Sequence, residues 1–283
     1  MTRAESFQAG DSAAPRPASN PQGFTLPGTS ARITAPSWDA LLSTVEARLA
    51  ARAGFSLATL NLDHLVKLRK DAAFREAYAA HDLVTADGNP IVWLARLAGH
   101  PVELVPGADL IVPLAAAAAR QGVSVALVGS TEDTLEAAAT RLRTAAPALE
   151  IALLHAPARG FDPNGDAAKA LIERIGESGA GLCLLALGAP KQERFAAMAQ
   201  SKLPGIGFAS LGAALDFAAG RQQRAPVLVR KLALEWVWRL ATEPKRLAGR
   251  YLACVLLLPR LLAAALAYRL NHASGDATGK GAA

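Results

Sequence analysis

The sequence predicts an α/β fold in which helices cover both faces of a parallel sheet, followed by a basic helical appendage. Three observations predict it. Short, continuously apolar runs recur along the chain, stretches with helical spacing separate them, and the composition changes after Gly220. Continuous apolar runs are typical of parallel strands buried on both faces, and their alternation with helices defines the α/β class. We therefore predict a Rossmann-like parallel sheet sandwiched by helices.

The elements follow one another from about Pro36. A helix comes first, because Trp38, Leu41, Val45 and Leu49 recur at helical spacing. Strands and helices then alternate, and the last strand leads into 211–220. The predicted strands are 55–61, 83–87, 123–129, 149–156, 181–188 and 204–210. The predicted helices are 37–53, 63–81, 89–99, 108–122, 132–147, 165–178 and 190–202.

The two ends of the chain differ from this core. The first 34 residues are rich in Ala, Pro, Ser and Gly and contain no apolar stretch of the kind a secretory signal needs. We expect a disordered tail over 1–34, a catalytic domain over 35–220, a helical appendage over 221–272 and a second disordered tail over 273–283.

The appendage is basic and amphipathic. Between Arg221 and Leu270 there are ten Lys or Arg residues and only two Asp or Glu residues. The run 251–268 is long enough to span a bilayer, but Pro259 and Arg260 interrupt its centre. Proline breaks helices and a central arginine is costly in hydrocarbon. We therefore expect this segment to lie on an anionic membrane surface, although its apolar residues could instead pack on the core.

Composition narrows the function further. The net charge is +6 and the pI about 9.6, which favours an anionic partner: phosphates, acidic lipid or nucleic acid. Cys183 and Cys254 lie inside apolar runs and are predicted to be buried thiols rather than a disulfide. The spacing of Cys and His does not match a zinc site.

Ligands of open α/β sheets bind beyond the carboxyl ends of the strands, and four strand ends carry suitable residues. At the first, Thr59 and Asn61 are two residues apart and share one face of the strand. Asn61 and Asp63 could equally serve to cap the next helix.

The second strand end carries Asp87, Gly88, Asn89 and Pro90. Here a carboxylate is followed by a glycine and then by a proline at a position where a helix can begin. This arrangement directs the carboxylate into the cleft. It can act as a general base toward an attacking hydroxyl. The alternative interpretation is a plain Asp-Gly turn.

The remaining strand ends combine glycine turns with helix N-termini. Gly129, Ser130 and Thr131 form a candidate anion site, although Thr131 or Ser130 could simply be an N-cap. The other candidates are two loop glycines, a cation, an amide and two carboxylates. Of these, Glu193 could instead be a carboxylate that only stabilises the N-terminus of its helix. They are Gly188, Lys191, Gln192, Glu193, Gly212 and Asp216.

Taken in order, these blocks resemble the WecG/TagA/CpsF glycosyltransferases (glycosyltransferase family 26). The resemblance runs from about Phe55 to Tyr251 and rests on T-L-N-L-D-H, A-D-G, V-P-G-A-D-L, A-L-V-G-S, R-G-F-D, G-A-P-K-Q-E, L-D-F-A-A-G, R-A-P, L-E-W-V-W-R-L and E-P-K-R-L. It implies a core of the GT-E type that needs no metal or cofactor. It also implies inverting transfer of a sugar, N-acetylmannosamine in the best-known members, from a UDP-sugar to a polyprenyl-diphosphate-linked acceptor. The expected location is the inner face of the bacterial cytoplasmic membrane.

The resemblance also assigns roles to individual residues. Asp87 aligns with the family's proposed base, Thr59 and Asn61 with sugar-positioning groups, and Gln192 with a nucleotide contact. Gly107 lies in the V-P-G-A-D-L block. The appendage arginines in family blocks, expected to hold a diphosphate, are Arg224, Arg239 and Arg246.

One position departs from the family. Many members carry an arginine where this chain has Leu104, so another cation must meet the diphosphate or the diphosphate binds differently.

Two other classes of protein share some of these features. A dehydrogenase shares the architecture, but no G-x-G-x-x-G follows the first strand. A nucleic-acid-binding protein would explain the charge, yet the basic residues are interleaved with aliphatic ones and aromatic content is 5%. The sequence leaves the donor sugar and homo-oligomer formation open.

Overall fold

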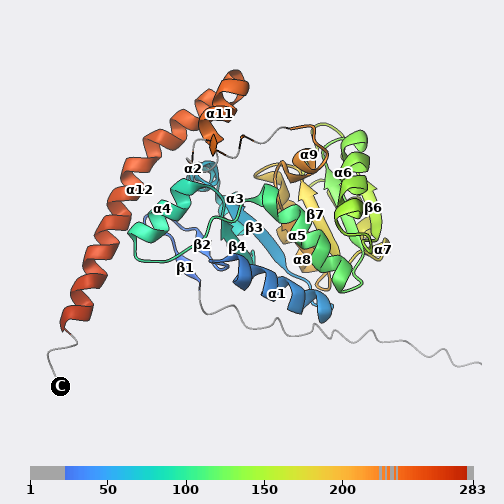
Figure 1. Ribbon diagram of the computed structural model, residues 1–283, viewed down its shortest axis with the longest axis horizontal. Helices are drawn as coiled ribbons and strands as arrows, with labels where there is room; N and C mark the ends of the chain where they lie inside the picture. Colours follow the sequence, from blue (N-terminus) through green and yellow to red (C-terminus); the bar gives the residue numbers. More distant parts are fainter. Residues whose placement is uncertain (1–22, 223–224, 227, 230–232, 234, 279–283) are drawn as a thin grey trace, which may run out of the picture.

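The structure of the chain, a computed structural model, describes residues 23–222, 225–226, 228–229, 233 and 235–278 (Figure 1). Six strands form one parallel sheet in the order β4-β3-β8-β7-β5-β6. They are β3 (Ser56–Leu60), β4 (Leu83–Ala86), β5 (Val125–Gly129), β6 (Ile151–His155), β7 (Leu182–Ala186) and β8 (Gly207–Ser210). The predicted class, a Rossmann-like parallel sheet between helices, is confirmed.

Helices cover both faces of this sheet. Alternate strand residues point to opposite faces, so Leu57 packs with one helical layer and Ala58 with the other. The first layer contains α1 (Trp38–Ala50), α5 (Gly107–Arg120), α6 (Glu132–Ala145) and α9 (Ala214–Ala218). The second contains α2 (Leu62–Lys70), α3 (Ala72–Ala79), α4 (Asn89–Leu97), α7 (Asp166–Glu177) and α8 (Lys191–Lys202). Both predicted cysteine thiols are free and buried.

The stretch 63–81, predicted as one helical region, is two helices that meet at Asp71. The backbone of Asp71 is extended, with φ −122° and ψ 105°. Its carboxylate accepts the backbone N–H of Phe74 at 2.9 Å, so it caps α3. The carboxylate also binds the Arg194 guanidinium through two 2.6 Å contacts. Cap and ion pair together explain why the helix stops and restarts here.

The N-terminal segment, predicted to be disordered through residue 34, is ordered from residue 23. Strands β1 (Phe24–Thr25) and β2 (Arg32–Ile33) form a two-stranded antiparallel sheet. Leu26 and Ile33 are fully buried, and the Thr34 hydroxyl accepts the backbone N–H of Val84 at 2.8 Å. The prediction was wrong for 23–34 because its apolar residues Phe24, Leu26, Ala31 and Ile33 stand singly and each strand is only two residues long, so no periodic pattern indicates them. Residues 1–22 lie outside the described residues.

The appendage consists of α11 (Glu235–Thr242) and the long α12 (Pro244–Thr278), which lies along α2 and α4 (Figure 1). The helix continues through Pro259, contrary to the prediction that proline breaks it, and beyond the predicted boundary at residue 272. One face of α12 is buried against the domain through Cys254, Leu257, Leu261 and Ala265. This packing holds the helix across the proline, where one backbone hydrogen bond is missing.

By length and composition, residues Leu247–His272 of α12 could cross a membrane. Its opposite face is exposed and apolar. The exposed large side chains on it are Leu252, Val255, Leu256, Leu262, Leu266 and Leu270. Packing on the core and an exposed apolar surface therefore occur on the same helix.

Candidate active site

The candidate base, Asp87, follows β4 at the carboxyl edge of the sheet. Its backbone N–H donates to the Leu60 carbonyl at 2.7 Å, which ties it to the end of β3. The Thr59 hydroxyl donates to Asp87 Oδ2 at 3.3 Å. Thr59 is 3% exposed, whereas Asp87 is half-buried. Two of the predicted residues, Thr59 and Asp87, are thus in direct contact.

Burial raises the pKa of Asp87 to about 6. The charge of Arg239 opposes this rise, Glu235 adds to it, and hydrogen bonding from Thr59 and Asn61 lowers it. A carboxylate with this pKa is mostly ionised at neutral pH yet basic enough to accept a proton from an attacking hydroxyl.

Asn61 and Gly88 border Asp87. Asn61 is the N-cap of α2, and its Oδ1 accepts the backbone N–H of His64 at 3.1 Å. The capping alternative is therefore confirmed for Asn61, whose amide group also influences Asp87. Gly88 has φ +113°, a conformation that favours glycine, and it precedes the half-buried Asn89 at the start of α4. Pro90 lies in the first turn of this helix, as predicted.

Arg239 on α11 reaches this edge of the sheet from the appendage. Its guanidinium carbon lies 5.2 Å from the centre of the Phe217 ring on α9, and its Nη2 lies 3.5 Å from Glu235 Oε1 in an ion pair. Since the charge of Arg239 also lowers the pKa of Asp87, the arginine lies within electrostatic range of the candidate base. The position of Arg239 is thus consistent with the prediction that an arginine of the appendage brings positive charge to the site.

A second cluster lies beyond β5 and β8. Ser130 Oγ donates to Asp216 Oδ1 at 2.7 Å, and Ser130 itself has φ +53°. Thr131 caps α6 by accepting the N–H of Thr134 at 3.4 Å, as the capping alternative expected. A Cβ at Gly129 would overlap the Ala186 carbonyl, so glycine is required where β5 meets β7. Both hydroxyls are engaged within the protein, and the loop's backbone remains available for an anion.

Gln192 joins the loop after β7 to the loop after β8. It is 2% exposed; its Nε2 donates to Glu193 Oε1 at 2.8 Å and its Oε1 accepts the Gly212 N–H at 3.1 Å. Glu193 is fully buried, and burial raises its pKa to about 7. Gln192 therefore holds Gly212 with its amide oxygen while its amide nitrogen is bonded to Glu193, a positioning role for a residue predicted to contact the nucleotide.

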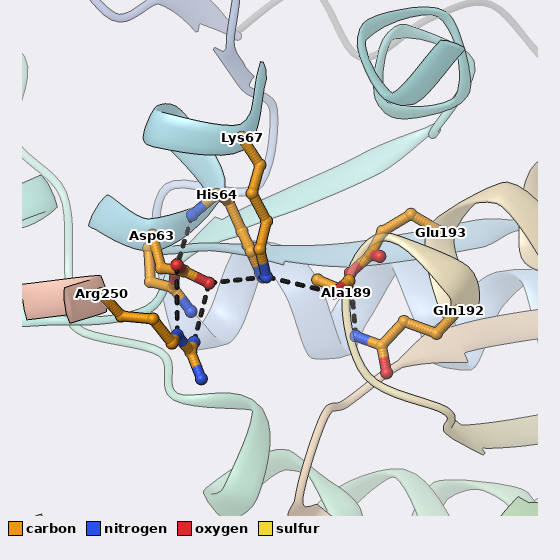
Figure 2. A network of polar contacts seen from close by, with 8 residues as sticks. Asp63, His64, Lys67, Ala189, Gln192, Glu193 and Arg250 are labelled. Carbon is orange, nitrogen blue, oxygen red and sulfur yellow. Dashed lines mark hydrogen bonds and ion pairs between the residues drawn. The ribbon is translucent and has the colours of Figure 1, made fainter. Parts of the chain in front are cut away.

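An ion-pair cluster that the sequence reading did not assign lies beside the site (Figure 2). Asp63 Oδ2 lies 2.7 Å from Lys67 Nζ and 2.7 Å from Arg250 Nη2. Lys67 Nζ also donates to the Ala189 carbonyl at 3.1 Å. Burial raises the pKa of Asp63, but its hydrogen bonds to Arg250 and Lys67 outweigh burial and hold the pKa below its usual value. Asp63 thus connects α12 to the loop that precedes Gln192.

The remaining predicted residues fall outside these contacts. Lys191 is exposed at the start of α8, and Gly188 has φ +72° with open space where a Cβ would lie. Gly107 is buried at the start of α5. A Cβ added to it would lie 3.0 Å from the Leu211 carbonyl oxygen, so this glycine has a packing role. Arg224 lies outside the described residues, as does the side chain of Arg246.

Leu104, where the family resemblance predicts an arginine, packs against the apolar cluster that includes residues of β3 and β4. Its carbonyl accepts the indole N–H of Trp38 at 3.1 Å. The position therefore supplies packing rather than charge. Among the described residues, Arg239 is the cation near Asp87 that can take over charge compensation.

Sequence reasoning missed two kinds of residue. The i,i+4 spacing of Asp63 and Lys67 on α2 could have predicted their ion pair, but nothing local predicts Arg250 as a third member. Tyr78 on α3 is buried; burial and the charges of Glu193 and Asp87 raise the pKa of its phenol. Within the described part of the chain, no group of three or more His, Cys, Asp or Glu side chains could hold a metal ion.

The geometry combines an ionisable carboxylate, hydroxyl and amide groups, and an arginine across the sheet edge. This set can accept a proton at one point and stabilise an anion at another. A family model described as "Glycosyl transferase WecG/TagA/CpsF family" matches residues 27–274 of the chain.

Proposed function

The chain belongs to the WecG/TagA/CpsF family of glycosyltransferases, which act in cell-surface polysaccharide synthesis, and from this premise we propose how it performs transfer. We propose that it moves a sugar from a UDP-sugar to a polyprenyl-diphosphate-linked acceptor with inversion at the anomeric carbon. The single observation that carries the proposal is the half-buried Asp87, bonded to Thr59 at the sheet edge and facing the charge of Arg239.

Asp87 serves as the general base in this proposal. The acceptor hydroxyl oxygen attacks the anomeric carbon while its proton passes to the Asp87 carboxylate. The bond from the anomeric carbon to the phosphate oxygen breaks, and UDP leaves with its electron pair. One in-line displacement inverts the configuration. Thr59 and Asn61, which flank Asp87, position the sugar and the carboxylate.

The departing UDP needs positive charge. Arg239 supplies it from α11, and the backbone of the Gly129–Thr131 loop at the start of α6 offers N–H groups to the diphosphate. Because the arginine and the helix N-terminus both supply positive charge to the diphosphate, we propose that transfer proceeds without a metal. Arg239 also accounts for the loss of an arginine at Leu104. We propose N-acetylmannosamine or a hexose as the transferred sugar.

The test is transfer activity of Asp87→Asn, measured as UDP release with a lipid-diphosphate-sugar acceptor. Turnover should fall by about 10²–10⁴-fold, the usual contribution of a general base. Asp166→Asn makes the same chemical change on α7, where the side chain is 96% exposed, and should leave turnover unchanged. Near-wild-type turnover of folded Asp87→Asn would remove Asp87 as the base.

The acceptor lipid gives α12 a membrane role. Exposed leucines on its outer face can enter the interface while the exposed Arg260 and Arg269 meet anionic headgroups. Because its other face is buried on α2 and α4, α12 lies along the domain, which favours an orientation on the surface over one across the bilayer. We propose peripheral attachment to the inner face of the cytoplasmic membrane.

Flotation with vesicles containing anionic lipid tests this attachment. Leu252→Ser combined with Leu256→Ser removes two side chains that are 59% and 72% exposed, so folding should be unaffected while bound protein decreases. Val112→Ser, at a 43% exposed site on α5, is the matched control. Equal flotation of both variants and the wild type would show that α12 is not the attachment surface. That the chain does not bind nucleic acid stays a prediction, which salt-sensitive filter binding can check.

A further inference from the structure

A cavity in the described structure lies away from the candidate active site. It has a volume of about 1160 Å³ and is lined by the β1–β2 hairpin, α1, α3 and the start of β4. Asp82 and Leu83 line it at the amino end of β4, whereas Asp87 follows the carboxyl end of that strand. Five residues of strand separate the two places by roughly 15 Å. The cavity is therefore a separate site, large enough for a small molecule.

Three arginines line this cavity: Arg32 on β2, Arg48 on α1 and Arg75 on α3. Arg48 Nη1 donates to the Gly54 carbonyl at 3.0 Å, and Arg75 Nη1 donates to the Leu68 carbonyl at 2.7 Å. One bond to a carbonyl fixes each guanidinium and leaves its other N–H groups available. Such preorganised guanidiniums suit phosphate oxygens.

The negative charge near these arginines is small. In the described part of the chain, none of the three forms an ion pair with a carboxylate. Asp82 is the single carboxylate among the lining residues, and its Oδ2 accepts the backbone N–H and the hydroxyl of Ser56 at 2.9 and 3.2 Å. The cavity thus has an excess of positive charge that an anionic ligand would neutralise.

His81 also contributes to the lining. It is 6% exposed, and its Nδ1 lies 2.8 Å from the Ala77 carbonyl, so Nδ1 carries the hydrogen. Its Nε2 is buried and does not reach the cavity surface. Burial lowers the pKa of His81 to about 4, which keeps the ring neutral near pH 7. The positive charge of the lining therefore comes from the arginines.

We propose that this cavity binds a small phosphate-bearing molecule. The guanidiniums of Arg32, Arg48 and Arg75 hold the phosphate. The alanines and aliphatic residues of the walls leave the rest of the ligand in an apolar surrounding. This site is independent of the sugar-transfer site at the opposite end of the sheet.

Isothermal titration of the full chain with glycerol 3-phosphate tests the phosphate contacts. Arg48→Gln and Arg75→Gln should each weaken binding by about tenfold or more, because each removes charge-assisted hydrogen bonds. Arg32→Gln should weaken it without affecting folding, since this side chain is exposed. Arg52→Gln is the matched control: Arg52 is likewise held by backbone carbonyls, those of Gln121 and Gly122, but lies outside the cavity. It should change affinity by less than about twofold.

Circular dichroism confirms that each variant is folded. Absence of binding at millimolar ligand, or equal affinity of the Arg48, Arg75 and Arg52 variants, would overturn the proposal. Loss of binding in Arg239→Gln but not in Arg75→Gln would place the anion in the candidate active site and overturn it equally.

Discussion

Replacement of Asp63 by asparagine tests how the appendage is held against the catalytic domain. The side chain of Asp63 is 12% exposed, and it contacts Lys67 and Arg250, which are 31% and 44% exposed, at 2.7 Å each. Breaking a fully buried ion pair costs about 3–5 kcal/mol, whereas a surface pair is worth about 0.2–1 kcal/mol. The two cations can regain water when the carboxylate is removed. We therefore expect Asp63→Asn to lower the free energy of unfolding by about 1–3 kcal/mol.

The pH dependence has a defined sign. The folded pKa of Asp63 lies below its unfolded value of 3.8. Its contribution to stability is therefore fully present above that unfolded value and is lost as the pH falls through the folded pKa. The stability difference between wild type and Asp63→Asn should be largest near neutral pH and shrink below about pH 4.

Urea denaturation supplies the measurement, and a double-mutant cycle with Arg250→Gln isolates the pair. A coupling energy of about 1 kcal/mol is expected, with faster hydrogen exchange in α12 for both single variants. Asp166→Asn, which breaks the exposed pair with Lys169, is the control and should leave stability unchanged. If Asp63→Asn were no more destabilising than this control, or if the coupling energy were zero, the Asp63–Arg250 pair would not be what holds α12 against the domain.

Three further predictions concern buried positions. Gly129→Ala places a Cβ onto the Ala186 carbonyl at φ +125° and should cost about 2–4 kcal/mol of unfolding free energy, seen as a lower thermal midpoint. Gly122→Ala, which has open space at φ +57°, should cost less, and equal midpoints of the two variants would contradict this. Tyr78→Phe removes a buried hydroxyl without a partner among the described residues and should change stability by less than about 1 kcal/mol; a larger loss in urea denaturation would reveal a hydrogen bond. Glu193 has a folded pKa of about 7, above its unfolded 4.5, so stability that is fully present below 4.5 declines up to pH 7 by at most about 3 kcal/mol. Glu193→Gln should flatten that decline, and an unchanged slope would argue against the raised pKa.

Much of the core was predictable because its pattern is local. The apolar runs and their alternation with helical spacing identified β3 through β8 and the helices between them. Aspartate and glycine at the end of β4 identified the position of Asp87. These predictions succeed because a buried parallel sheet imposes its own periodicity on each segment.

The errors arose where tertiary contacts override local pattern. Nothing near Asp71 indicates that Arg194, far along the chain, will bind its carboxylate and help to stop a helix. Pro259 is tolerated because the face of α12 around it is buried against the domain. The pairing of Asp63 with Arg250 likewise joins residues that are distant in sequence.

The sequence predicted which residues form the site, but it did not predict which of them are free to bind a ligand and which hold their neighbours in place. Thr59 and Asp87 are in contact as expected. Gln192 has the ligand-type amide that the sequence suggested, yet both ends of it are engaged by Glu193 and Gly212. Only the arrangement of three loops in space distinguishes a residue that binds a ligand from one that holds its neighbour in place.

The pH–rate profile of sugar transfer measures whether Asp87 acts as the general base. The base acts as a carboxylate, so kcat/KM should fall as the pH drops through an apparent pKa near 6. Because the charge of Arg239 lowers the pKa of Asp87, Arg239→Gln should move this acid limb to higher pH. A profile that stays level down to pH 4.5, in a protein that remains folded there, would contradict Asp87 as the base.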